Sequence, residues 1–135
     1  MSILKVEEVT PKNIRAVIPP KYKGLGYKKL KAGDVVTLTS VVFSVYNAKK
    51  NGEPIVTRDG ENITNVTVYL GLDDGHYTSL KNDIVYAQMS ALVGFVEDSI
   101  GYYDYDFDPE KVKVVSVKTK MGQKEIDVLA FESIL

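Results

Sequence analysis

The 135-residue sequence contains no cysteine and one histidine, His76. A structural zinc site needs four nitrogen or sulfur ligands and a catalytic zinc site usually needs three protein ligands, so cysteine and histidine can supply neither here. The absence of cysteine also excludes thiol catalysis and disulfide bonds. A serine triad would have to use His76, because the chain has no other histidine.

The motifs of common catalytic sites are missing too. No serine lies in a G-x-S-x-G turn, and neither G-x-x-x-x-G-K-[ST] nor G-x-G-x-x-G occurs. The acidic residues Asp104, Asp106, Asp108 and Glu110 do not form an EF-hand, because Pro109 stands where such a loop has glycine. We therefore predict a protein that is not an enzyme and holds no metal or cofactor. A nuclease that uses Asp104, Asp106 and Glu110 is the weakest alternative.

Long hydrophobic runs are absent. No apolar stretch approaches the roughly 20 residues that cross a bilayer. The first eight residues have neither the basic start nor the apolar run of a secretory signal. We therefore expect an intracellular protein without a membrane partner. The length is typical of one domain, and we predict a single domain over residues 1–135.

Charge is distributed unevenly along the chain, although the formal net charge is only −1. Residues 1–60 hold eleven lysines and arginines against five aspartates and glutamates, a net charge of +6, so the remaining residues carry −7. Such a division indicates a basic face with an acidic counterpart. A mixed, solvated surface is the alternative.

Residues 1–32 have the composition of an irregular, basic N-terminal arm. Pro11, Pro19 and Pro20 interrupt regular structure, because proline fixes its own backbone angle and lacks the amide donor. Residues 19–31 then combine two glycines, two tyrosines and five lysines. We expect this arm to precede a compact part over residues 33–135.

Three strands are expected after the arm. Residues 35–46 are rich in β-branched side chains, and their apolar positions change face near Ser40, which indicates a β-bulge. Residues 63–72 alternate between apolar and polar side chains, as in a half-buried strand. Asp73-Asp74-Gly75 is a tight turn that leads into a short strand over residues 76–80.

One helix follows the third strand. Asn82 or Asp83 is the expected N-cap of a helix of about four turns. Residues 97–110 form an acidic, tyrosine-rich connection, and strands are expected again over residues 111–119 and 125–134. The apolar residues at helical spacing are Ile84, Val85, Met89, Leu92, Val93 and Val96.

The expected order is strand, strand, strand, helix, strand, strand. This is the order of the five-stranded OB-fold barrel, in which one helix lies between the third and fourth strands. Other small α+β domains share the order. The fold that we predict is therefore mainly β, a five-stranded OB-fold barrel with one helix and the irregular basic arm.

An OB-fold binds single strands with exposed aromatic rings that stack on bases and with a basic groove that follows the phosphates. Tyr69 lies on the polar face of its strand, so its ring points away from the core. Tyr46 and Tyr77 lie on neighbouring strands, and Phe43 fits either a stacking or a core position. An ordinary, partly exposed cross-strand tyrosine is the alternative interpretation of Tyr69.

The candidate phosphate contacts lie in three segments. The arm contributes Tyr27, Lys28 and Lys29, which interleave a ring with charge; a solvated tail is the alternative. The other two segments are the loops with which OB-folds clamp their ligands. The loop between the first two strands holds Lys49, Lys50 and Arg58, and the last hairpin holds Lys118 and Lys120.

Several short motifs carry a family resemblance. They are Gly26-Tyr27-Lys28-Lys29-Leu30, Gly33-Asp34, residues 74–80 and Lys111-Val112-Lys113-Val114-Val115. From Gly26 onward the sequence resembles the single-stranded DNA-binding proteins of small tailed phages, including those of protein-primed replication systems. The resemblance implies an OB-fold that coats displaced strands without sequence preference, with Tyr46, Tyr69 and Tyr77 as the stacking residues.

These observations lead to one functional prediction and one rival. We predict sequence-independent binding and protection of single-stranded DNA in phage DNA replication, by a monomer or small homo-oligomer with replication proteins as further candidate partners. A phage-encoded protein would act in the cytoplasm of the host cell. The rival is a non-enzymatic structural or adaptor protein, such as a virion component or an OB-like protein-interaction module.

Overall fold

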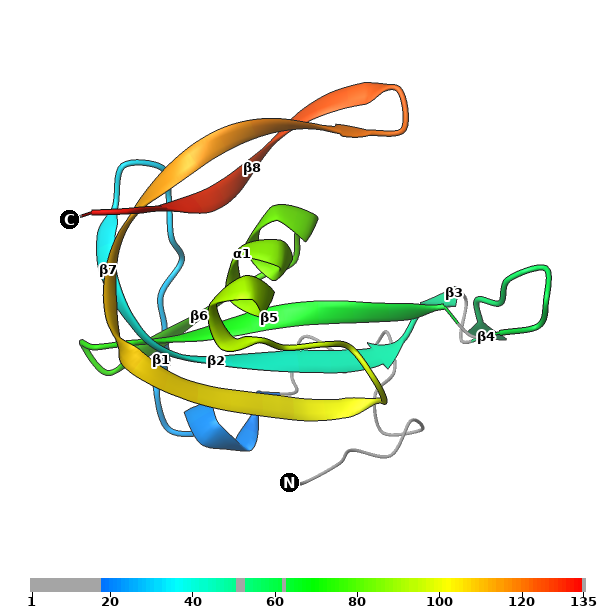
Figure 1. Ribbon diagram of the computed structural model, residues 1–135, viewed down its shortest axis with the longest axis horizontal. Coiled ribbons are helices and arrows are strands. Elements are labelled where there is room, and N and C mark those ends of the chain that lie inside the picture. Colours follow the sequence, from blue (N-terminus) through cyan, green and yellow to red (C-terminus); the bar gives the residue numbers. More distant parts are fainter. Residues whose placement is uncertain (1–17, 51–52, 62, 135) are drawn as a thin grey trace.

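The computed structural model describes residues 18–50, 53–61 and 63–134 (Figure 1). The chain is mainly β with a single α-helix among these residues. In chain order, the elements are η3 (Pro20–Tyr22), β1 (Gly26–Tyr27), β2 (Val35–Asn47), β3 (Lys49–Lys50), β4 (Glu53–Pro54), β5 (Thr64–Leu72), β6 (His76–Leu80), α1 (Asp83–Val93), β7 (Gly101–Met121) and β8 (Lys124–Ser133).

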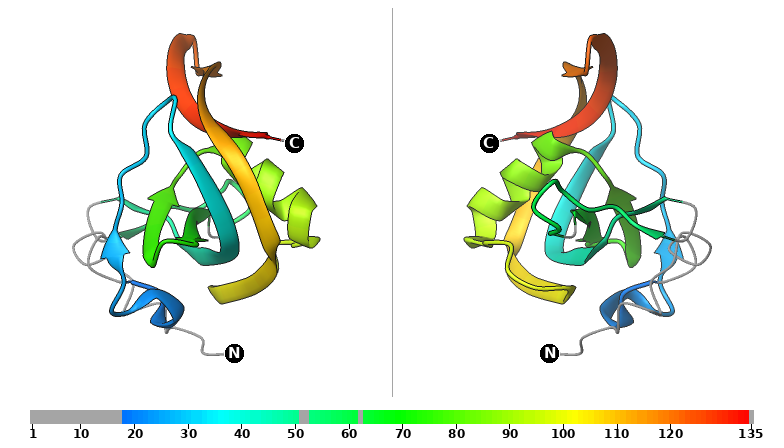
Figure 2. Two further views of the ribbon diagram at one scale, coloured as in Figure 1. Left: turned by 90° about the vertical axis from the view of Figure 1, so that its left-hand side faces the viewer. Right: turned by 90° about the vertical axis from the view of Figure 1, so that its right-hand side faces the viewer.

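The main sheet has six strands in the order β1-β6-β5-β2-β7-β8. Strand β1 runs parallel to β6, and all other neighbours are antiparallel. The sheet curls around α1 into a half-barrel (Figures 1 and 2). The expectation of five strands is therefore wrong by one, because two residues of the arm pair with the edge of β6. Strands β3 and β4 form a separate two-stranded sheet.

The predictions of β2, β5, β6 and α1 are confirmed. Most of their ends lie within two residues of the predicted ends. The Asn82 side chain accepts a hydrogen bond from the Val85 amide at 2.8 Å, as an N-cap does. The helix ends at Gly94, whose φ of 71° is left-handed. It therefore has three turns rather than four, and two of the apolar residues at helical spacing, Leu92 and Val96, are exposed.

The acidic, tyrosine-rich segment is the clearest correction to the predicted elements. Residues 101–110 form the first half of β7 and pair with β2, instead of forming a connection. Tyr103, Tyr105 and Phe107 are partly buried against the core, and the aspartates between them are exposed. This alternation is that of a half-buried strand, and pairing with the central strand outweighs the poor β-propensity of aspartate.

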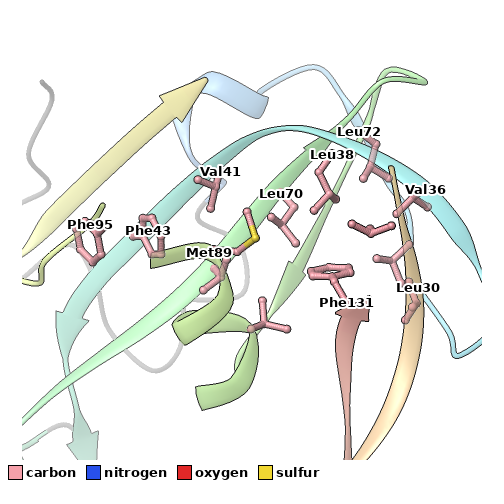
Figure 3. Close-up of a cluster of buried hydrophobic side chains, with 14 of the residues drawn as sticks. Leu30, Val36, Leu38, Val41, Phe43, Leu70, Leu72, Met89, Phe95 and Phe131 are labelled. Atoms are coloured by element: carbon pink, nitrogen blue, oxygen red, sulfur yellow. The ribbon is translucent and has the colours of Figure 1, made fainter. Parts of the chain in front are cut away.

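The predicted β-bulge lies between Leu38 and Ser40, where the register of β2 shifts against both β5 and β7. The shift explains the change of face in the sequence. Val36 and Leu38 before the bulge and Val41 and Phe43 after it all point into the same core. Figure 3 shows these side chains meeting residues from α1 and β8 inside the curl.

The described part of the arm is packed against the sheet. Tyr22 is 2% exposed and Leu30 is 4% exposed. The Lys28 amide donates to the Tyr77 carbonyl at 2.8 Å, next to the short parallel pairing of β1 with β6. The interpretation of residues 18–32 as a solvated tail is therefore wrong, and that of residues 1–17 lies outside the described residues.

Candidate nucleic-acid interface

The face of the sheet that points away from α1 is the outer face, and it collects tyrosines. Tyr69 of β5 lies in register between Val42 of β2 and Ser79 of β6. Tyr77 of β6 lies opposite Gly71 in the next row. A second apolar cluster, separate from the core inside the curl, joins these positions; it comprises Tyr22, Val42, Tyr77 and Tyr102, with Ile18 and Tyr69 packed against it.

Two rings of the arm contact Tyr77. The Tyr22 ring is stacked on it with a centroid distance of 5.7 Å and an interplanar angle of 5°. The Tyr27 ring meets it edge-on at 5.5 Å and 73°. Both geometries are favourable for aromatic pairs. Tyr77 is consequently buried, whereas Tyr27 is 53% exposed.

Tyr46 lies at the other end of the outer face. Its hydroxyl is 3.2 Å from Oγ1 of Thr67, and its side chain is buried. The Nζ atom of Lys81 lies 5.5 Å from the centre of its ring, within range of a cation–π interaction. The sheet thus places a cation beside the tyrosines, at the end of β6.

Burial controls the ionisation of these tyrosines. It raises the pKa of Tyr22, Tyr69 and Tyr102 to about 12 each. For Tyr69 the neighbouring Tyr102 and Tyr46 add to the effect of burial. The three phenols therefore stay neutral near pH 7 and place no negative charge on the outer face.

Lys81 also lines a cavity of about 430 Å³ at the open side of the half-barrel. The walls come from the start of β5, the start of α1 and the β7–β8 hairpin. Lys120, one of the predicted cations, lines the same cavity. The other lining residues are Thr64, Asn65, Val66, Asn82, Asp83, Ile84, Tyr86, Glu97, Thr119, Ile126 and Val128.

Lys28 and Lys29 directly follow Tyr27 in the chain, beside the start of β6. Nζ of Lys28 lies 3.3 Å from Oδ2 of Asp74, and Nδ1 of His76 lies 3.2 Å from Oδ1 of the same carboxylate. Partial desolvation raises the pKa of Asp74, but the hydrogen bonds from Lys28 and His76 outweigh it, so the pKa lies below its ordinary value. Lys29 is exposed.

Among the described residues, no contact joins Phe43, Lys118 or Arg58 to the tyrosines of the outer face. Phe43 is fully buried in the core, where its ring stacks on Phe95 at 4.1 Å, so it is not available to a ligand. Lys118 is exposed and lies 3.4 Å from Glu125 on the hairpin. Arg58 is exposed in the turn after β4. Lys49 and Lys50 form β3, and their side chains lie outside the described residues.

Three exposed carboxylates accompany the tyrosines on β7. Asp104, Asp106 and Asp108 occupy alternate positions of the strand and so share one face. Nζ of Lys21 lies 2.6 Å from Oδ1 of Asp106. Within the described residues, no group of three or more histidine, aspartate and glutamate side chains is arranged to hold a metal ion.

Sequence reasoning missed Lys81, Tyr102 and the packing role of Tyr22. Lys81 directly follows β6, which corresponds to the third predicted strand. This position could have indicated that its side chain lies on the outer face. The sequence pattern predicts that Tyr102 lies in a connection, and it therefore does not reveal that Tyr102 and the core-facing Tyr103 point to opposite faces of a strand. Nothing local indicates that Tyr22 contacts Ser40 and Tyr77, because both contacts depend on the tertiary fold.

The chain matches no family model, and searches of curated proteins and of solved structures find no match to it. In the part of the chain that the structure describes, no helix has the length and apolar character needed to cross a membrane.

Proposed function

We propose that the protein binds single-stranded DNA without sequence preference, through the outer face of β5 and β6. The observation that carries this proposal is the set of tyrosines around Tyr69, with the Lys81 ammonium beside Tyr46 at one end. Aromatic rings stack on any base, because every base has a π-face, and lysines attract the phosphates between them.

The topology supports an OB-type fold as the scaffold. If β2, β5, β6, β7 and β8 are numbered one to five, their order in the sheet is three, two, one, four, five. This is the order of an OB barrel opened between its third and fifth strands. The helix follows the third strand, as in that fold, and OB-folds bind oligonucleotides on strands two and three. Those strands correspond to β5 and β6.

Lysines lie at the two ends of β6, and three exposed aspartates of the same sheet lie on β7, which β5 and β2 separate from β6. Lys81 follows the end of β6 beside Tyr46, and Lys28 and Lys29 follow Tyr27 beside the start of β6. Tyr69 and Tyr77 lie between these two groups of cations. A bound strand would therefore stack on the sheet in the middle and meet ammonium groups at both ends. The protein would protect displaced strands during replication, together with other replication proteins.

The test is a titration with poly(dT) that follows tyrosine fluorescence, since the chain has no tryptophan. We expect quenching on binding, and we expect the affinity to fall as salt rises, because lysine–phosphate contacts release counterions. A matched titration with heparin separates stacking from charge alone. No change of fluorescence with poly(dT) at low salt would exclude the proposal.

The acidic half of β7 favours a second candidate, a protein-interaction module. Asp104, Asp106 and Asp108 are exposed on one face, and β8 does not pair with this half of the strand. An exposed strand edge with carboxylates suits a basic, extended peptide. Binding of an oligolysine peptide but not of poly(dT) would favour this candidate over DNA binding.

A further inference from the structure

The ring of Tyr22 lies against the outer face of the sheet. It is parallel to Tyr77 at an interplanar angle of 5°, and its hydroxyl is 2.8 Å from Oγ of the buried Ser40. Only 2% of the residue is exposed. The planar ring of Tyr22 thus stacks on Tyr77, as a nucleobase stacks on aromatic side chains in single-strand binding proteins. The polar group at the edge of the ring hydrogen-bonds to Ser40.

Gly71 makes the space for this ring. A Cβ atom on Gly71 would lie 2.3 Å from Oγ of Ser40 and 3.1 Å from Cε1 of Tyr22. Any side chain at this position would therefore displace either the hydroxyl or the ring. We call the space over Gly71, between Tyr77 and Ser40, the Gly71 site.

Next to this site, residues 19–25 of the arm are attached to the sheet by side chains and not by their backbone. The backbone hydrogen bonds of residues 19–25 in the described structure are local: Tyr22 donates to Pro19, Lys23 to Pro20 and Leu25 to Tyr22. A cavity of about 450 Å³ lies beside Pro19 and Pro20. It is also lined by Lys21, Val42, Tyr102, Tyr103, Asp104 and Tyr105.

An ion pair joins the arm to β7. Nζ of Lys21 lies 2.6 Å from Oδ1 of Asp106, and the carboxylate is 81% exposed. The ammonium group of Lys21, next to the Tyr22 ring, is thus bound to a carboxylate of β7. Water screens an ion pair whose carboxylate is exposed, so the pair contributes little to holding the arm. The arm is therefore weakly held at this point.

We propose that the Gly71 site is a nucleobase site and that Tyr22 occupies it in the free protein. The inference rests on the proposed function. A base of the bound strand replaces the Tyr22 ring on Tyr77, and the segment Pro19–Lys23 leaves the sheet when the strand binds. The arm thus competes with DNA for part of the outer face and lowers the affinity of the free protein.

Substitutions that release the arm test this competition. Lys21→Gln removes a positive charge, so electrostatics alone predicts weaker poly(dT) binding, whereas release of the arm predicts binding about two- to fivefold tighter. Asp106→Asn should tighten binding by a similar factor. Tyr22→Ala empties the site, and we expect a gain of about two- to tenfold from the lost aromatic contact.

Matched variants separate the arm from charge. Lys23→Gln removes an exposed charge two residues from Lys21 and should not tighten binding. Asp108→Asn removes an exposed charge on the same face of β7 as Asp106 and should have a smaller effect than Asp106→Asn. Thermal unfolding of each variant shows whether it remains folded, which matters most for Tyr22→Ala.

A direct measurement uses nuclear Overhauser contacts between the Tyr22 and Tyr77 rings in the full chain. We expect these contacts to disappear when oligo(dT) binds. If wild type binds poly(dT) but the contacts persist, or if Lys21→Gln and Tyr22→Ala bind no tighter, the Gly71 site is not a nucleobase site. If neither wild type nor any variant binds poly(dT), the proposed function itself is wrong.

Discussion

The side chain of Gln88 on α1 meets the backbone of Phe131 on β8 as a neighbouring strand would. Nε2 of Gln88 donates to the Phe131 carbonyl at 2.7 Å, and the Phe131 amide donates to Oε1 at 3.1 Å. Nδ2 of the Asn82 side chain donates to the Leu129 carbonyl at 2.9 Å in the same way. The helix therefore covers the part of the β8 edge that faces away from β7, where an open strand edge would otherwise invite pairing with another chain.

Replacing Gln88 by alanine should expose this edge. Loss of the two hydrogen bonds leaves partly buried backbone groups unsatisfied, and we expect the free energy of unfolding to fall by about 1–3 kcal/mol. Hydrogen exchange at the Phe131 amide should accelerate in the variant. Gln123→Ala, in the exposed β7–β8 turn, is the control and should change neither quantity. An unchanged exchange rate at Phe131 would contradict this account of the edge.

Tyr69→Ala should weaken poly(dT) binding by about 1–3 kcal/mol, the usual contribution of one base–aromatic stack. The reason is the central position of Tyr69 between Val42 and Ser79 on the outer face. Tyr69→Phe keeps the ring and should retain most of the affinity. Fluorescence titration measures the poly(dT) affinity of both variants. Equal affinities of the alanine variant and wild type would show that Tyr69 does not contact the bound strand.

Lys81→Gln should reduce the salt dependence of binding. One lost phosphate contact on a single strand lowers the slope of log K against log salt by about 0.7. The control is Lys118→Gln, because Lys118 lies on the hairpin beside Glu125 and away from the tyrosines. Titrations at several salt concentrations measure both slopes. Equal slopes for the two variants would argue against a phosphate contact at Lys81.

The protein should lose stability between about pH 10 and pH 12. The pKa of Tyr22, Tyr69 and Tyr102 is about 12 in the folded chain, mainly because of burial, and about 10 in an unfolded chain. The unfolded state therefore loses these protons first, and stability that is complete below pH 10 declines as the pH rises. Denaturant unfolding at several pH values, together with tyrosinate absorbance, tests this. Stability that stays constant over this range would contradict the burial of these phenols.

The regular elements that could be predicted share a clear local pattern. Core-facing apolar side chains alternate with other side chains over residues 65–72, and the Asn82 cap and Gly94 mark both ends of the helix. The first half of β7 was missed because aspartate at every second position resembles a loop. Its strand conformation depends on pairing with β2, which is distant in sequence.

The candidate site could be predicted only where it follows from strand parity. Tyr69 was placed on the outer face because its neighbours in sequence face the core. Phe43 was ambiguous because the bulge before it reverses the parity of β2, and a sequence shows the bulge only approximately. Tyr22 lies 49 residues before Gly71, the residue that makes room for it, so no local pattern could relate the two.

The central position of β2 has a consequence for the speed of folding. Val45 pairs with Gly101 and Val35 with Lys113, so joining β2 to β7 closes loops of 56 and 78 residues. The entropy of closing such loops must be overcome before the contacts inside them stabilise the chain. Folding should therefore take milliseconds to seconds, as in other β proteins of high contact order. Before β2 joins β7, local contacts can already assemble the β5–β6 hairpin, the β7–β8 hairpin and the helix.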